Sequence, residues 1–135
     1  MVDGYIKGAG VLVVALLFGG MFLFSATFAS FLFKHLSPKD ARLLIRKAFP
    51  SFYLFVIFCS GLAALLFFPS DPRNAAWMVG VVITALMARQ GLMPAINAAT
   101  DAGLKTRFLW LHGFSVLLTL AHIVIAGLVL VRASH

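Results

Sequence analysis

Long apolar runs separated by short polar connectors make up most of this sequence. Three of the runs contain no charged residue, and each is longer than the ~20 residues that an α-helix needs to cross a bilayer. Another run is interrupted near its far end by Arg89. The pattern predicts membrane-spanning helices at about 8–33, 50–68, 75–95 and 108–131.

The connectors are short, so consecutive helices must run antiparallel. We therefore expect an all-α fold, in which residues 1–135 form a single integral membrane domain, a four-helix bundle. Pro69 and Pro72 favour a tight turn before the third helix, with Asn74 as its expected cap. The first run is too long for the apolar region of a signal peptide, and we expect it to remain as a spanning helix.

The connector between the first two runs is predicted to form a short amphipathic helix at the membrane interface, with an ordinary basic loop as the alternative. Ser37 is a favourable N-cap, and Pro38 suits the first helical position. In a helical projection of residues 39–49, charged and apolar side chains occupy opposite arcs, and Pro50 is expected to end this helix or to kink it into the second span. The basic face of this helix consists of Lys39, Arg42, Arg46 and Lys47.

Composition and charge support lipid as the solvent of this chain. The sequence is 62% hydrophobic and only 11% charged, which leaves too little polar surface for a soluble domain of this size. The net charge of +7 could suggest nucleic acid, but the bases lie at the ends of apolar runs and do not alternate with aromatic residues. We therefore expect the basic face to meet anionic membrane lipids or another membrane protein, and we expect no nucleic-acid partner.

Several stretches share a pattern with a known family. The first run ends in "GGMFLFSATFASFLFKHL", and the second begins with "RKAFPSFY". Together with "ARQGLMPAIN" and "FLWLHGFSVLLTL", these stretches resemble the transmembrane-protein-205-like family, a domain of unknown function with bacterial members. The chain departs from that family at "YIKGAGV", where many members carry a histidine. The resemblance implies a four-helix membrane fold and brings no reaction, substrate or cofactor.

The fourth run carries polar residues on one face. His112, Ser115, Thr119 and His122 fall within about 80° of one another on a helical wheel. Together with Arg89 they could form a polar track between the third and fourth helices, which is typical of a small-solute or metal-ion transporter. Alternatively, these side chains form hydrogen bonds between helices and fix their packing.

Catalytic patterns are missing from the sequence, which contains no Ser-His-Asp, Cys-His, paired-carboxylate or phosphate-loop arrangement, and we predict a non-enzyme. Haem is not expected, because no second histidine lies at the depth of His122. The methionines and Cys59 are scattered in depth, so we expect no metal and no cofactor. The third run also has a ridge of small residues that would let helices approach closely. This ridge consists of Gly80, Thr84, Ala88, Gly91 and Ala95.

These observations favour an accessory or structural subunit of a larger membrane assembly, with other membrane subunits as partners. The chain offers such partners almost nothing except helix surface, because its connectors are short. Transport through the polar track is the alternative function.

The distribution of basic residues predicts the topology. Eight of the 11 Lys and Arg residues lie at the ends of the first and third runs that meet one side of the membrane, and three lie on the other side. The positive-inside rule places the eight in the cytoplasm of a bacterium and both termini outside its inner membrane. A reporter enzyme fused to the C-terminus should be active only outside the cytoplasm. A fusion that works only in the cytoplasm would contradict this topology.

Overall fold

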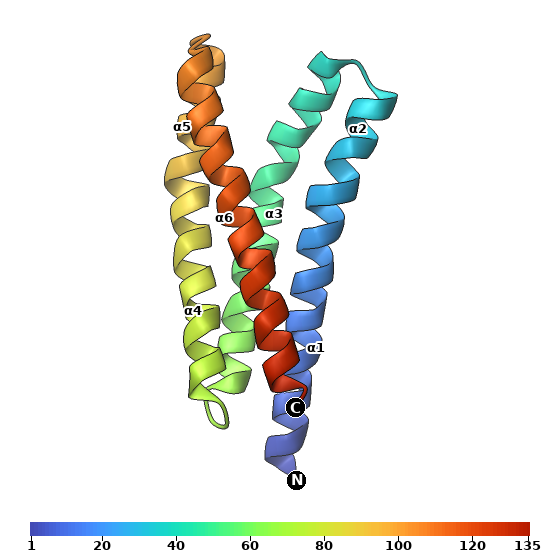
Figure 1. Ribbon diagram of the computed structural model, residues 1–135, viewed down its shortest axis with the longest axis vertical. Coiled ribbons are helices and arrows are strands. Elements are labelled where there is room, and N and C mark those ends of the chain that lie inside the picture. Colours follow the sequence, from blue (N-terminus) through green and yellow to red (C-terminus); the bar gives the residue numbers. More distant parts are fainter.

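The computed structural model describes residues 1–135 and contains helices but no strands. Four continuous rods are long and apolar enough to cross a membrane (Figure 1). This confirms the predicted all-α fold with four spanning helices. Two of the rods contain a short π-helical segment, labelled η. In chain order, the rods are α1 (Val2–Phe22) with η1 (Leu23–Phe28) and α2 (Ala29–His35); α3 (Pro38–Phe67); α4 (Pro72–Met87) with η2 (Ala88–Leu92) and α5 (Met93–Asp101); and α6 (Lys105–Ala133).

The predicted interfacial helix is not a separate element. Residues 39–49 are helical, but they form the first turns of α3, which continues through Pro50. The sequence therefore predicts the helical conformation correctly, and of the two outcomes expected at Pro50 the helix continues into the second span. Proline removes one backbone donor, yet neighbouring groups can compensate for this loss within a membrane helix. The start of the helix is as predicted, because the Ser37 side chain accepts a hydrogen bond from the backbone N–H of Asp40 at 3.2 Å.

The connectors at both ends of the third rod also differ from the prediction. Asp71, rather than Asn74, caps α4 and accepts a hydrogen bond from the Asn74 backbone N–H at 3.2 Å. At the other end, the expected polar connector over 97–107 is mostly helical. The chain turns at Gly103, whose φ of 68° is favourable only for glycine, and the Leu104 N–H reaches back to close the last helical turn.

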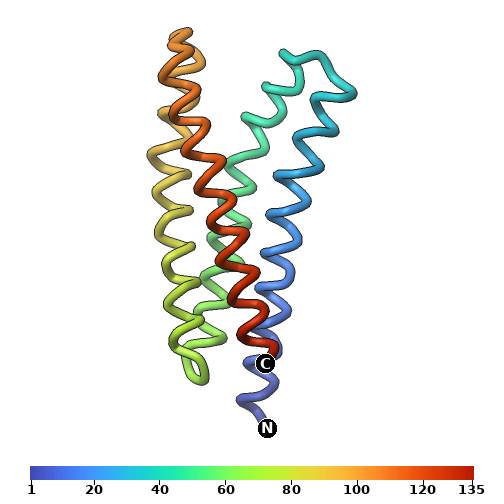
Figure 2. The backbone as a smooth tube through the Cα atoms, in the orientation of Figure 1, coloured from blue at the N-terminus to red at the C-terminus, as the bar shows by residue number.

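The core lies toward the end of the bundle that holds both termini. The largest fully buried side chains of α1, α3, α4 and α6 meet there, and they include Leu17, Val56, Phe67, Met78 and Val129. Toward the opposite end, the first rod and α3 diverge from α5 and α6, so the bundle opens into two arms (Figure 2). Few side chains are buried in this open end.

Close packing of α1 against α3 depends on a glycine. A Cβ atom added to Gly10 would lie 2.9 Å from the ring of Phe67, which is itself fully buried and has no room to move. Gly8 lies on the opposite side of the same helix, and a Cβ atom there would meet nothing within 4 Å.

This difference generates a test of the core. Gly10→Ala should lower the free energy of unfolding in detergent by about 1–3 kcal/mol, because the methyl group overpacks the contact with Phe67. Gly8→Ala is the matched control and should leave stability unchanged or raise it slightly through helix propensity. Equal stability of the two variants would contradict the packing described above.

Candidate functional site

The predicted polar face of α6 divides into buried and exposed members. His122 and Ser115 are buried, with 3% and 8% of their surface exposed. Thr119 is half-buried, whereas His112 is exposed and stacks on the ring of Phe108 with centroids 5.4 Å apart. Only part of the predicted track therefore lies inside the bundle, and His112 lies outside it.

His122 joins α6 to α4. Its Nε2 atom lies 2.7 Å from Oγ1 of Thr84. The same hydroxyl lies 2.8 Å from the backbone carbonyl of Gly80. Both contacts are satisfied when the hydroxyl donates to that carbonyl and accepts a hydrogen bond from the Nε2–H of the histidine. Thr84 thus connects the imidazole to the helix backbone, and this pair fixes how α4 and α6 meet.

Ser115 and Arg89 join the neighbouring helices to α3. The hydroxyl oxygens of Ser115 and Tyr53 lie 3.4 Å apart in a buried contact. The Nε atom of Arg89 donates a long hydrogen bond of 3.4 Å to the carbonyl of Pro50. Arg89 is partly buried and contacts protein, so it does more than anchor the rod at the membrane surface.

Arg89 lies in the π-helical segment η2. Met93 and then Pro94 follow this segment, and Pro94 cannot donate the usual hydrogen bond to the carbonyl four residues earlier. The N–H of Met93 instead reaches the carbonyl of Ala88, five residues back. Such π-helical turns shift the side chains that follow relative to those that precede. The members of the predicted ridge of small residues differ in exposure: Ala88 is buried, whereas Gly80 and Gly91 are exposed.

The basic face at the start of α3 contains one internal ion pair. Arg46 and Asp101 form two hydrogen bonds, of 2.7 and 2.9 Å, which link α3 to the end of α5 across the open end of the bundle. Lys39, Arg42 and Lys47 are exposed and form no ion pair within the chain. Three of the four predicted basic residues therefore remain available to lipid or to a partner.

Sequence reasoning did not identify the partners of these groups. Tyr53, Thr84 and Asp101 each lie in a different rod from the residue that they contact. For Tyr53 and Thr84, the sequence contained one usable signal, a hydroxyl group within an apolar run. Such a group in lipid needs a hydrogen-bond partner on another helix. No group of three or more His, Cys, Asp or Glu side chains lies close enough together to hold a metal ion.

Four apolar rods with polar side chains directed between them define a multi-pass membrane protein. The chain belongs to the family described as "Domain of unknown function (DUF4149)", whose model matches residues 12–105. The matched region extends from α1 to the start of α6 and includes both π-helical segments. No curated protein matches the chain, and no solved structure does.

The contact between α4 and α6 can be measured by a double-mutant cycle. Thr84→Val and His122→Leu should each lower stability, and together they should show a coupling energy of about 0.6 kcal/mol, the average for hydrogen bonds between membrane helices. Unfolding in a denaturing detergent is the measurement. Thr119→Val, on the same face of α6, should show no coupling to His122→Leu. Additive effects of Thr84→Val and His122→Leu would contradict a direct hydrogen bond.

Proposed function

We propose that this protein is a non-enzymatic accessory subunit of a larger assembly in the bacterial inner membrane, with both termini outside. The outward face of α1 is the observation that carries the proposal. Gly4, Gly8 and Gly19 are exposed there, and a Cβ atom on any of them would meet nothing within 4 Å. With the half-buried Ala15, these small residues follow one another at intervals of four, seven and four positions, which keeps them on one side of the helix.

A face of glycines has no side chains to pack against lipid tails, but it lets another helix approach closely. Association of helices in a bilayer depends on packing at small residues and on hydrogen bonds, because the lipid tails are as apolar as the side chains. The opposite side of α1 carries Val14 and Leu17 and packs in the core of the bundle. The space beside Gly4, Gly8 and Gly19 is therefore not filled by the chain itself and suits a helix from another subunit.

The unpaired bases and exposed aromatic residues support the same proposal. Lys39, Arg42 and Lys47 have no acidic partner in the chain and could meet an acidic surface on a neighbouring subunit. Large rings such as Phe58 and Trp110 are more than two-thirds exposed, so the outer surface offers apolar contact over several helices. Such surface fills space at an interface, while the small residues set how closely the helices approach.

The alternative function is transport of a small solute or metal ion along the polar track. Both buried members of the track, Ser115 and His122, are hydrogen-bonded to other helices. This arrangement supports a role in helix packing, and so the subunit hypothesis comes first. Transport would require these side chains to exchange their present partners for a solute or an ion.

Extraction in mild detergent tests the proposal. The wild-type protein should elute within a heteromeric complex of fixed composition. The double variant Gly8→Leu, Gly19→Leu should elute alone, because the added side chains occupy the space that the partner helix needs, and a Cβ atom at either position meets nothing in the chain within 4 Å. Gly113→Leu, at an exposed glycine of α6 with equally open surroundings, is the matched control and should remain in the complex.

Two further results bear on the choice between the functions. Reversing the charge of Arg42 should loosen the complex, whereas Arg46 is unsuitable for this test because its reversal also breaks the internal pair with Asp101. If the wild-type protein instead purifies alone and conducts a solute in liposomes, and if Arg89→Leu with His122→Leu abolishes that flux, the subunit proposal is wrong and transport replaces it.

A further inference from the structure

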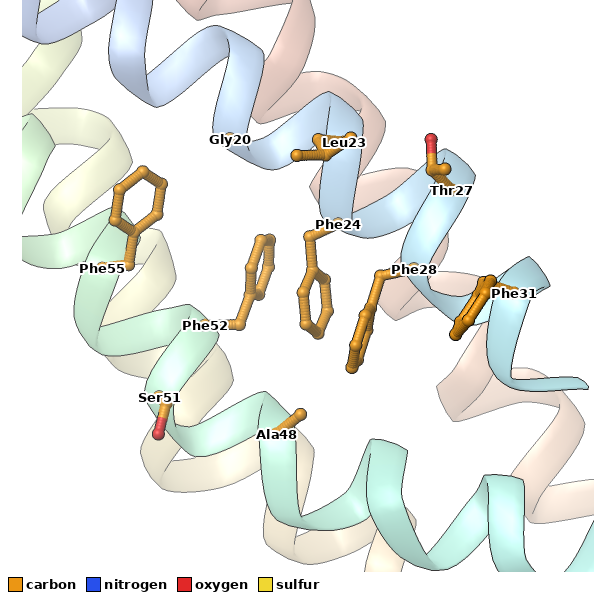
Figure 3. A pocket seen from close by; sticks show the side chains of 10 residues that line it. All are labelled: Gly20, Leu23, Phe24, Thr27, Phe28, Phe31, Ala48, Ser51, Phe52 and Phe55. Carbon is orange, nitrogen blue, oxygen red and sulfur yellow. The ribbon is translucent and has the colours of Figure 1, made fainter. Parts of the chain in front are cut away.

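An aromatic groove lies between the first rod and α3, on the outside of the bundle (Figure 3). Its volume is about 810 Å³, which is within the range of small-molecule sites. The ring of Phe24 stacks on Phe52 with centroids 4.3 Å apart and on Phe28 at 5.2 Å, and these rings stand side by side between the two helices. Phe31 closes the row and is 57% exposed, so the groove opens to the surroundings of the protein.

The lining of this groove suits a hydrocarbon chain. Thr27 and Ser51 supply the only side-chain oxygens, and no charged residue lines the groove. A partner helix would need small side chains in order to approach this closely, whereas here aromatic rings project into the space. A flexible acyl chain can follow such an irregular apolar surface, and acyl chains surround a spanning segment on every side.

The same groove leads to basic residues at one end. Lys34 lies one helical turn beyond Phe31 on α2, and His35 packs on Phe31 with ring centroids 4.6 Å apart. On the facing wall, Lys47 lies one helical turn before Ser51. Lys34, His35 and Lys47 are all exposed. Long lysine side chains beside an apolar wall extend toward the interface and place their ammonium groups at headgroup depth.

No acidic side chain neutralises this basic end. The chain contains one salt bridge, between Arg46 and Asp101, and neither lysine takes part in it. Asp40 is the acid on the same stretch of α3. It lies seven residues from Lys47, which is about 10 Å along the axis, and it belongs to the first turn of the helix, where its charge is favourable. Positive charge therefore remains available where an apolar groove reaches the polar zone.

We propose that this groove binds one anionic phospholipid. An acyl chain lies along the stacked rings of Phe24, Phe28 and Phe52, and the phosphate meets Lys34 and Lys47. The arrangement combines an apolar channel with positive charge at one end, which matches the chemistry of such a lipid. This inference goes beyond the role as a subunit, since it concerns the chain alone and a different face of α1 from that of Gly4, Gly8 and Gly19.

Native mass spectrometry of the purified protein tests the inference. The protein is mixed with phosphatidylglycerol or with phosphatidylcholine of the same chain length, and bound lipid is counted. One phosphatidylglycerol should remain bound in preference to phosphatidylcholine. Lys34→Ala and Lys47→Ala should each weaken phosphatidylglycerol binding about five-fold, which is the contribution expected for one lysine near an anionic surface.

Two variants distinguish binding in the groove from a general attraction of the anionic lipid to positive charge. Lys105→Ala with Arg107→Ala removes two positive charges from the first turn of α6, one more than either single lysine variant, and should leave lipid binding unchanged. Ala48→Phe keeps the charge but fills the groove, and it should abolish binding of both lipids. Circular dichroism and gel filtration show whether this variant folds. As a second measurement on the wild-type protein, a phosphatidylglycerol with a photoreactive acyl chain should label residues 20–31 and 48–55.

Several results would overturn the inference. Equal binding of the two lipids would show that the lysines do not recognise a headgroup. Labelling outside the groove would place the lipid elsewhere. A dimer that Ala48→Phe dissociates would show that a second copy of the chain occupies the groove. The lipid measurements use the purified protein, so their outcome is independent of whether the Gly8→Leu, Gly19→Leu variant leaves the heteromeric complex.

Discussion

Backbone hydrogen bonding is the constraint on which the rest of this structure depends. In hydrocarbon, an unpaired N–H or C=O group costs several kcal/mol, so a chain that crosses the membrane must pair its backbone within each segment. The rods satisfy this requirement almost throughout. Two of their special features occur at prolines, whereas η1 contains no proline. At Pro94 the helix widens into a π-helical turn, and at Pro50 the carbonyl accepts a second contact from Arg89. Arg89 lies beside both of these backbone features.

The few interior polar contacts then connect the rods to one another. Ser115 ties α6 to α3, and His122 ties the same helix to α4. Each contact pairs a group that would otherwise face hydrocarbon, and both contacts adjoin residues of the buried core. At the open end, Arg46 and Asp101 provide the one ion pair between the two arms. The interior polar contacts thus act together with the apolar core, whereas the ion pair links the arms where few side chains are buried.

The sequence predicts the four spans well, because uninterrupted apolar runs of this length have few other stable conformations. It also identifies the cap at Ser37. It is less decisive where the outcome depends on neighbours. Local rules leave open whether the helix ends at Pro50, and they do not predict that residues 97–101 remain helical. Among the candidate residues, the inward direction of His122 followed from spacing on one face. Its contact with Thr84 depends on how two distant rods pack, which no local pattern records.

The divergence of the two arms gives the molecule a different width at its two ends (Figure 1). The end with both termini is narrow, because four helices share a core there. The other end spreads, so it displaces more lipid from its leaflet than the narrow end displaces from the opposite one. A membrane inclusion with such a wedge-shaped profile places unequal lateral stress on the two leaflets. This shape favours a bilayer that curves toward the narrow end and resists one that curves the other way.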